Sequence, residues 1–384
     1  MRAWAASKRV PARFLVLGAF LFAGVLKAGP TLSRLPVDLT LLAGGGLAWV
    51  LLRAWIGGAR AASCRGLGLT GLWYATFLPG AALAAPTSYA FQKVATLFSF
   101  SLLASLAPFV LLREREDLRP FLDAVAFFCL VLTVDGLLGA GQGAQRLETA
   151  GGGTIALGRS AGFLFLFGAL LLARPGPVSL PILGLTGAAA VAAVFSGSRG
   201  PMAGAVVALA LTFALGRRGA GMAVRKLLLC GGALALAVGL SLALAPPGSL
   251  RRTASFLRGE FGSSEQYRAL AARASWERLG SEPWGTGWGG FAALVDLDGG
   301  TVRQYPHNLL LEVTLESGWA CGACTALVLG AALGAARARA DRPEGRILFA
   351  GLVFWIINAL VSGDVNDNRP LFAFVSAALC LGAP

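Results

Sequence analysis

The sequence predicts an all-α protein, a polytopic bundle of about twelve membrane-spanning helices that forms a single domain over residues 1–384. Its mean hydropathy is +0.70, and 56% of its residues are hydrophobic whereas only 14% are charged. Soluble domains have about 45–50% apolar and about 25% charged residues. The 52 glycines fit a membrane bundle, because small residues allow close approach of helices in lipid.

Apolar runs of roughly 20 residues predict the individual membrane helices. The chain holds such runs at approximately 14–30, 36–56, 67–85, 94–112, 121–140, 155–173, 178–196, 201–216, 226–246, 308–335, 347–362 and 370–383. The one long polar segment, residues 247–306, follows the ninth run and precedes the tenth. We expect short helices in this loop, above all over Ser264–Leu279, because Ser264 can cap a helix and Gly280 stops it.

Basic residues predict the orientation of the bundle. With the N-terminus in the cytoplasm, cytoplasmic segments hold 19 of the 33 lysines and arginines, and short outer segments and span ends, including Lys93, hold 7. Long loops are left out of this comparison because they translocate largely regardless of charge. Nine spans before the loop then place residues 247–306 outside the cytoplasm. The net charge of +14 is explained by this topology and not by nucleic-acid binding.

His307 is the single histidine and the strongest candidate for acid–base chemistry. It follows Pro306 and precedes an apolar run, which predicts a position at a helix N-terminus. The positive end of the helix dipole disfavours imidazolium, so the ring is expected to be neutral and available as a base. Asn308, Glu312 and Glu316 recur every four residues and are expected to share one face of that helix.

Arg199 lies between two apolar runs, in the segment Ser196–Gly200, on the predicted outer face. A guanidinium suits bidentate binding of phosphate oxygens, and the flanking glycines and serines let backbone N–H groups approach an anion. Snorkelling of the side chain to the interface is the alternative. Within the loop helix, Arg268 and Arg273 fall on different faces, so we expect different roles for them.

The order of four motifs resembles the O-antigen ligase and O-antigen polymerase superfamily. These are S-x-S-R-G at Ser196–Gly200, Arg268 fifteen residues before Pro283, P-x-G-x-G at Pro283–Gly287, and H-N-x-x-L-E-x-x-x-E-x-G at His307–Gly318. The resemblance implies an integral membrane glycosyltransferase of the bacterial inner membrane, active on the periplasmic side. Its donor would be an undecaprenyl-diphosphate-linked glycan, and its acceptor lipid A-core or another glycan.

The resemblance also implies the roles of single residues. Arg199 and Arg268 would bind the donor diphosphate, and His307 would activate the acceptor hydroxyl. Asn308, Glu312, Arg159 and Arg273 are expected to support them. The implied reaction inverts the anomeric carbon and uses neither a cofactor nor a metal ion.

Three functions remain as alternatives. A ligase and a polymerase share these motifs and differ in their acceptor, and the His-Asn-Glu motif with a single long loop favours the ligase. A flippase for the same lipid-linked glycan is disfavoured, because transporters place polar residues near the middle of the membrane. Here charge is concentrated in one loop and at the span ends, and Arg159, Asp135 and Asp364 are the nearest to buried charges.

Overall fold

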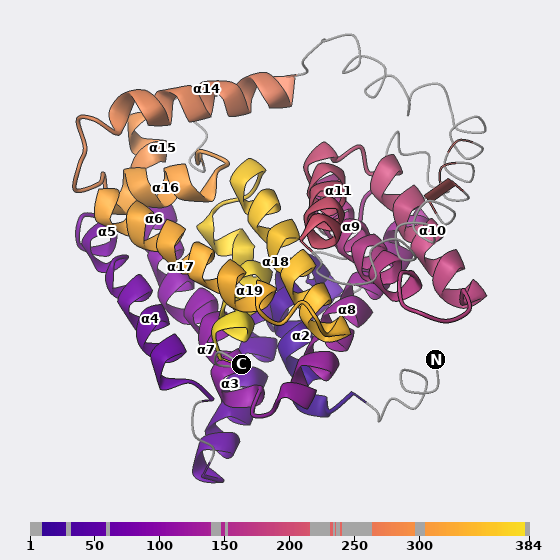
Figure 1. Ribbon diagram of the computed structural model, residues 1–384. Coiled ribbons are helices and arrows are strands. Elements are labelled where there is room, and N and C mark those ends of the chain that lie inside the picture. The colour runs from indigo at the N-terminus through magenta and orange to yellow at the C-terminus, as the bar shows by residue number, and fades with distance from the viewer. Residues whose placement is uncertain are drawn as a thin grey trace.

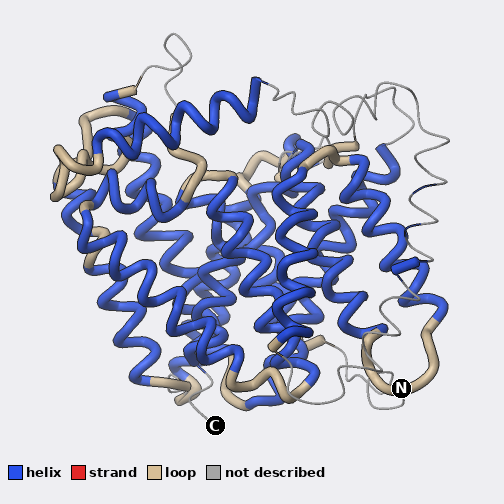
Figure 2. Tube along the Cα trace, turned by 45° about the horizontal axis from the view of Figure 1, so that its top comes forward, coloured by secondary structure: helices blue, strands red, loops and turns tan. Residues whose placement is uncertain are grey.

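The computed structural model (Figures 1 and 2) describes residues 10–27, 32–58, 62–139, 147–149, 153–215, 263–295 and 304–380, with single positions 231, 232, 235 and 239. Over these ranges the regular elements are helices, apart from one isolated β-bridge between Thr149 and Gly153. The predicted ninth span, 226–246, falls almost entirely outside the described residues, as do 247–262 and 296–303 of the predicted loop.

The helices in chain order are α2 (Ala12–Leu26), α3 (Leu39–Ile56), α4 (Cys64–Ala75), α5 (Leu78–Ala82), α6 (Ser88–Thr96), the π-helical turn η2 (Leu97–Ser101), α7 (Leu102–Leu111), α8 (Leu118–Leu138), α9 (Gly153–Leu172), α10 (Leu180–Phe195), α11 (Arg199–Ala214), α14 (Ser263–Arg278), α15 (Gly290–Leu294), α16 (Leu309–Ser317), α17 (Trp319–Arg337), α18 (Pro343–Val361), the short 3₁₀ turn η5 (Val365–Asn368) and α19 (Arg369–Cys380).

Six helical segments within the described ranges are long and apolar enough to cross a membrane, which confirms a polytopic helical membrane protein. They are Leu39–Ile56, Ser88–Leu111, Arg115–Leu138, Gly153–Leu172, Trp319–Arg337 and Pro343–Val361. Three shorter apolar helices, α2, α10 and α11, accompany them. The total of about twelve spans stays a prediction.

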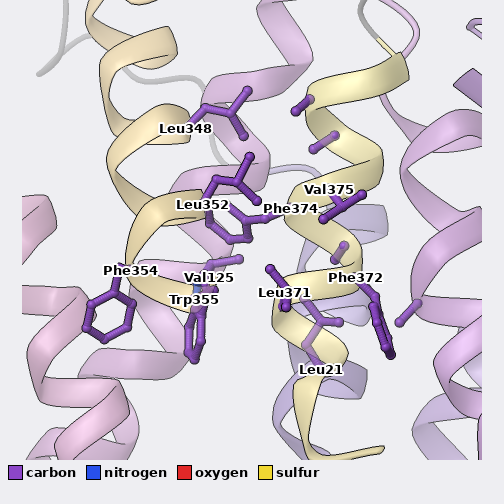
Figure 3. Close-up of a cluster of buried hydrophobic side chains, with 14 of the residues drawn as sticks. Leu21, Val125, Leu348, Leu352, Phe354, Trp355, Leu371, Phe372, Phe374 and Val375 are labelled. Carbon is purple, nitrogen blue, oxygen red and sulfur yellow. The ribbon is translucent and has the colours of Figure 1, made fainter. Parts of the chain in front are cut away.

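Helices α18 and α19 form the centre of the bundle. Their facing side chains, among them Leu348, Leu352 and Phe374, are buried and pack together as Figure 3 shows. The ring of Phe163 on α9 packs against this pair, with its centroid 5.7 Å from that of Phe374. The C-terminal helices are therefore the packing core on which the helices of the N-terminal half assemble.

Two predicted spans are interrupted, so the expectation of a single helix in each was wrong. The run 67–85 is divided between α4 and α5, and the run 308–335 is divided at Gly318, between α16 and α17. Gly318 has φ 89° and ψ 169°, outside any helical region. Apolar runs report burial in lipid or protein, but they do not reveal a change of helix direction inside the run.

The Pro283–Gly287 segment causes this second interruption by capping the end of α16. Thr286 N–H donates to the carbonyl of Leu315 over 2.8 Å, and Gly287 N–H donates to the carbonyl of Glu316 over 3.0 Å. These are carbonyls that a helix terminus leaves without partners in the helix. The next residue, Trp288, is fully buried and its indole N–H donates to the Phe77 carbonyl over 2.9 Å.

Helix α14 crosses one end of the bundle above α15 and α16 (Figure 1). Its observed bounds, Ser263–Arg278, confirm the helix predicted over Ser264–Leu279 to within one residue at each end. A small apolar cluster packs α14 against α15 and α16. In this cluster Ala271 and Leu279 contact Phe291 and Leu315. The loop helix is thereby fixed to α16, the helix that follows His307.

We expect Gly287→Ala to destabilise the protein. The Gly287 φ of +84° disfavours any residue with a Cβ, and a Cβ here would overlap the Leu83 carbonyl. A loss of about 2 kcal/mol or more in unfolding free energy follows from backbone strain and overpacking, measured by thermal unfolding in detergent. Gly334→Ala is the control, because its Cβ would meet nothing within 4 Å; equal melting temperatures for the two variants would contradict the capping role.

Candidate active site

His307 lies immediately before the cap of α16. Asn308 is the cap residue, and its side-chain oxygen accepts from the Leu311 N–H over 3.1 Å. The predicted position at a helix N-terminus is thus confirmed, with Asn308 as the cap that precedes the first helical residue. His307 itself has φ +57°, the one non-glycine residue with positive φ among the described residues. Such backbone strain concentrates at functional sites.

The imidazole of His307 is half-buried between two tyrosines. Its ring centroid lies 4.3 Å from that of Tyr305 and 5.7 Å from that of Tyr267. Its Nδ1 is buried and has no hydrogen-bond partner among the residues that the structure describes. A buried nitrogen of this kind is a rare and costly state.

Burial, and after it the positive charge of Arg268, lowers the pKa of His307 from 6.5 to about 4, while Asp364 acts in the opposite direction. The ring is therefore neutral at pH 7, as the sequence predicted. The cause of the lowered pKa differs from the predicted one. The sequence attributed it to the helix dipole, whereas burial and a neighbouring guanidinium lower the pKa in the structure.

Arg268 is the cation next to His307. It lies on the buried side of α14, and its Nε has no hydrogen-bond partner among the described side chains and backbone groups. Arg273 lies on another face, with 77% of its side chain exposed, and it forms an ion pair with Glu277 over 2.8 Å. The two arginines lie on different faces as predicted, and helical spacing turns Arg273 to the surface. Its expected support of the site stays a prediction.

Arg199 is the first residue of α11, at a junction of three helices. The preceding Ser198 donates its hydroxyl to the Thr154 carbonyl of α9 over 2.9 Å. A Cβ on Gly200 would lie 2.8 Å from the Val361 side chain at the end of α18. The S-x-S-R-G motif therefore shapes a tight helix junction, and Arg199 projects from that junction.

Arg159 of α9 joins this junction to the histidine. Its Nη2 donates to the Ser362 carbonyl over 2.8 Å, one residue beyond Val361 at the end of α18. Arg268 and Tyr305 are both within electrostatic reach of Arg159. The structure thus brings Arg268 and His307 together directly and places Arg199 beside the end of α18 to which Arg159 binds.

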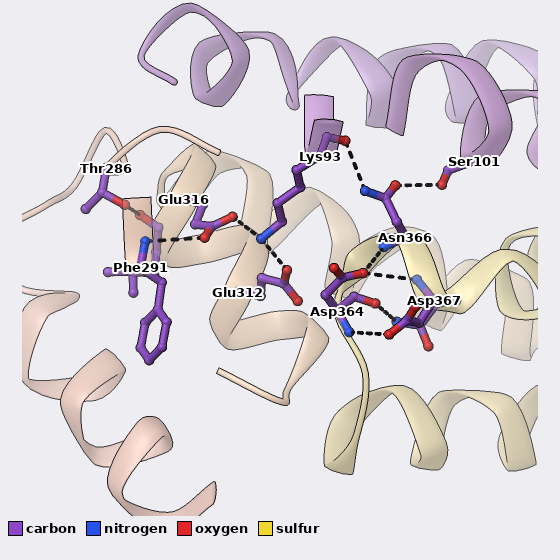
Figure 4. A network of polar contacts seen from close by, with 11 residues as sticks. Lys93, Ser101, Thr286, Phe291, Glu312, Glu316, Asp364, Asn366 and Asp367 are labelled. Atoms are coloured by element: carbon purple, nitrogen blue, oxygen red, sulfur yellow. Dashed lines mark hydrogen bonds and ion pairs between the residues drawn. The ribbon is translucent and has the colours of Figure 1, made fainter. Parts of the chain in front are cut away.

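A buried ion-pair cluster supports the helix that follows His307 (Figure 4). Lys93 Nζ lies 2.6 Å from Glu312 Oε1 and 2.5 Å from Glu316 Oε2, and none of the three side chains is exposed. The shared face of Glu312 and Glu316 was predicted. Lys93 was counted among the outer segments and span ends, and it does lie near the start of the span Ser88–Leu111. Its burial with two glutamates was not predicted, because no local pattern reveals a partner more than 200 residues away in the chain.

The turn η5 is a second feature that the sequence did not single out as part of a site. The Asp364 carboxylate accepts the backbone N–H groups of Asn366 and Asp367 over 2.8 and 3.1 Å. The Asn366 side chain then donates to the Lys93 carbonyl over 3.0 Å and accepts from Ser101 over 2.9 Å, as Figure 4 shows. The turn is thereby attached to the helix that carries Lys93.

Metal ligands are not grouped in the described ranges, where no three His, Cys, Asp or Glu side chains are placed to hold an ion. The candidate groups are one neutral imidazole and several guanidiniums. Such a set can accept a proton and stabilise a phosphate leaving group.

Comparison with protein families agrees with this arrangement. Residues 184–326 match the family model described as O-antigen ligase, and no curated protein matches the chain. These residues therefore form an O-antigen ligase domain, a domain found in membrane glycosyltransferase-like enzymes that include O-antigen ligases and polymerases. Arg199, Arg268 and His307 lie within the matched residues, whereas Lys93, Arg159 and η5 lie outside them.

We expect Lys93→Met to destabilise the protein by about 3–5 kcal/mol, because it leaves two buried carboxylates without their cation. Thermal unfolding in detergent measures this loss. Lys27→Met is the matched control, since the Lys27–Asp38 pair is 43% and 38% exposed and such pairs contribute little. A Lys93→Met protein as stable as the Lys27→Met protein would show that the cluster does not support α16.

Proposed function

We propose that this protein is an O-antigen ligase-like glycosyltransferase. It moves a glycan from an undecaprenyl-diphosphate carrier to a hydroxyl of lipid A-core or of another glycan acceptor. The observation that carries the proposal is the proximity of His307 and Arg268, because the guanidinium is close enough to lower the pKa of the imidazole. Each side chain also has a buried nitrogen without a hydrogen-bond partner among the described residues.

In the proposed reaction His307 removes the proton of the acceptor hydroxyl as its oxygen attacks the anomeric carbon. The bond between that carbon and the diphosphate oxygen breaks, and its electron pair leaves with the diphosphate. Attack opposite the leaving group inverts the configuration. Arg268 and Arg199 stabilise the negative charge that develops on the diphosphate, which preorganised guanidiniums do without reorganisation.

Arg268 has a second effect in this proposal. In the free protein its charge helps to keep His307 neutral. A bound diphosphate would neutralise that charge, so the pKa of His307 would rise once the donor is in place. The base would then be strongest when the donor is bound, when a proton must be taken.

A polymerase that extends the lipid-linked glycan is the second candidate, because the matched domain occurs in both kinds of enzyme. The two differ in the acceptor. Glycan analysis of a deletion strain separates them: shortened chains on a decorated core indicate a polymerase, and an undecorated core indicates a ligase. A flippase, the third alternative, would form no glycosidic bond in an assay with purified protein.

We expect His307→Gln to lose roughly 10²–10⁴-fold in transfer rate, because glutamine keeps the hydrogen-bonding capacity but cannot accept a proton. The acidic limb of wild-type kcat/KM should lie near pH 4 and not near pH 6.5, since protonation of His307 removes the base as pH falls through its pKa of about 4. Pre-steady-state and steady-state assays over roughly pH 3.5–8, a range that covers the usual pKa of histidine, measure the transfer rate and the acidic limb. Near-normal transfer by His307→Gln with the same acidic limb would assign the proton to another group.

Arg268→Lys should retain part of the donor affinity and lose most of the turnover, because lysine keeps the charge but not the bidentate fork. Arg199→Ala should weaken donor binding. Arg273→Lys is the matched control on the same helix and should behave as wild type. Transfer at the wild-type rate by both Arg199→Ala and Arg268→Ala would remove these arginines from the diphosphate site.

The proposed location is the bacterial inner membrane, with the loop 247–306 and His307 facing the periplasm. A cysteine introduced at position 299, outside the described residues, should react with a membrane-impermeant thiol reagent in intact spheroplasts. The native cysteines are replaced first so that the label reports one site. Labelling only after lysis would reverse the orientation and, with it, the assignment of a periplasmic donor.

A further inference from the structure

An open cavity of about 860 Å³ lies beside His307, lined by residues of α2, α3, α6, η2, α9, α18, α19 and the segment that joins α18 to α19. Its volume is within the range of small-molecule sites. Tyr305, whose ring contacts that of His307, forms part of its wall. Neither Arg199 nor Arg268 lines it, so the cavity is separate from the proposed diphosphate contacts.

Five of the cavity-lining residues carry a buried polar atom that has no hydrogen-bond partner within the described part of the chain. These atoms are Thr40 Oγ1, Tyr89 Oη, Arg159 Nε, Trp355 Nε1 and Ser362 Oγ. Buried polar groups are paired in most cases, and each one left alone is costly. Five such atoms from four helices and the α18–η5 connection around one cavity indicate a ligand that would complete their hydrogen bonds.

The types of these atoms define the chemistry of that ligand. Three are hydroxyls, which can donate or accept, and two are N–H donors. The carboxylates of Asp364 and Asp367 also line the cavity, opposite in charge to Arg159 and Arg369. The two lining lysines have partners of their own, Lys27 with Asp38 and Lys93 with Glu312 and Glu316. A phosphate offers acceptors only and would meet the two aspartates, whereas a neutral sugar offers hydroxyls that donate and accept.

The remaining wall is apolar and suits the same ligand. Phe22, Val25 and Leu41 contribute this surface, and Tyr89, Tyr305 and Trp355 contribute aromatic rings. A pyranose presents C–H groups on its faces and hydroxyls around its edge. A cavity with one apolar wall and a polar wall of balanced charge is therefore complementary to a sugar.

We propose that this cavity is the acceptor subsite. It binds the terminal sugar of the acceptor glycan through Tyr89, Ser362 and their neighbours, and directs a hydroxyl past Tyr305 to His307. The donor diphosphate remains outside it, at Arg199 and Arg268. This inference rests on the proposed function and extends it, because it assigns the second substrate to a cavity whose lining residues, apart from Tyr305, lie outside the matched residues 184–326.

Kinetics with purified full-length protein test the subsite, using an undecaprenyl-diphosphate-linked glycan as donor and lipid A-core as acceptor. Tyr89→Phe and Ser362→Ala should each raise the acceptor KM roughly 2- to 10-fold, the equivalent of one hydrogen bond. The donor KM should not change. The melting temperature should stay the same or rise, because the removed hydroxyls have no hydrogen-bond partner among the described residues.

Ser376→Ala is the matched control. Ser376 also has a buried hydroxyl with no hydrogen-bond partner in the described ranges, but it does not line the cavity. It should leave the acceptor KM at the wild-type value. An acceptor KM unchanged in both Tyr89→Phe and Ser362→Ala would overturn the subsite while leaving the transferase function intact.

A binding measurement that needs no turnover distinguishes the two proposals. Lipid-free core oligosaccharide should bind to wild type and to His307→Gln, and more weakly to Tyr89→Phe. Binding without transfer by wild type would contradict the proposed function and support the subsite. Inorganic diphosphate is the competing probe: if it displaces the oligosaccharide and Asp367→Asn tightens its binding, the cavity is an anion site and the inference is wrong.

Discussion

The burial of one ammonium group between two carboxylates is the constraint on which the active-site end of the bundle depends. Lys93, Glu312 and Glu316 are withdrawn from water together, and the desolvation of each charge is compensated only by close contact with the others. Since Lys93 belongs to α6 and both glutamates belong to α16, these contacts fix the two helices in one register. The cap residue Asn308 and His307 before it are positioned by that register.

The same cluster extends to the turn after α18. The carbonyl of Lys93 accepts from Asn366, so η5 and its aspartates are held by the helix that carries the lysine. A π-helical turn, η2, follows directly in this helix and brings Ser101 to Asn366. π-turns frequently mark functional sites, where they shift side chains out of ordinary helical register. The cavity wall and the histidine are consequently parts of one connected polar framework inside an apolar bundle.

Electrostatics divides this end of the bundle into two regions with different chemistry. Around Arg268 and His307 positive charge prevails and the imidazole stays neutral, which suits an anionic leaving group beside a base. In the cavity the charges of Arg159 and Arg369 face those of Asp364 and Asp367, which suits a neutral ligand. Tyr305 lies at the boundary, in contact with the histidine and exposed to the cavity.

The sequence by itself determined the class of protein, the helical content, the loop helix α14 and the motifs around Arg199, Arg268 and His307. Each depends on local composition or on spacing within one segment, which hydropathy and helical periodicity report directly. Only the tertiary structure decided that α16 ends at Gly318, that Lys93 is buried with two glutamates, that Arg273 faces outward and that a cavity lies beside the histidine. These features arise from contacts between residues far apart in the chain, such as Gly287 with Glu316 and Lys93 with Asn366. A local pattern contains no information on such partners, because burial and pairing are properties of the packed bundle.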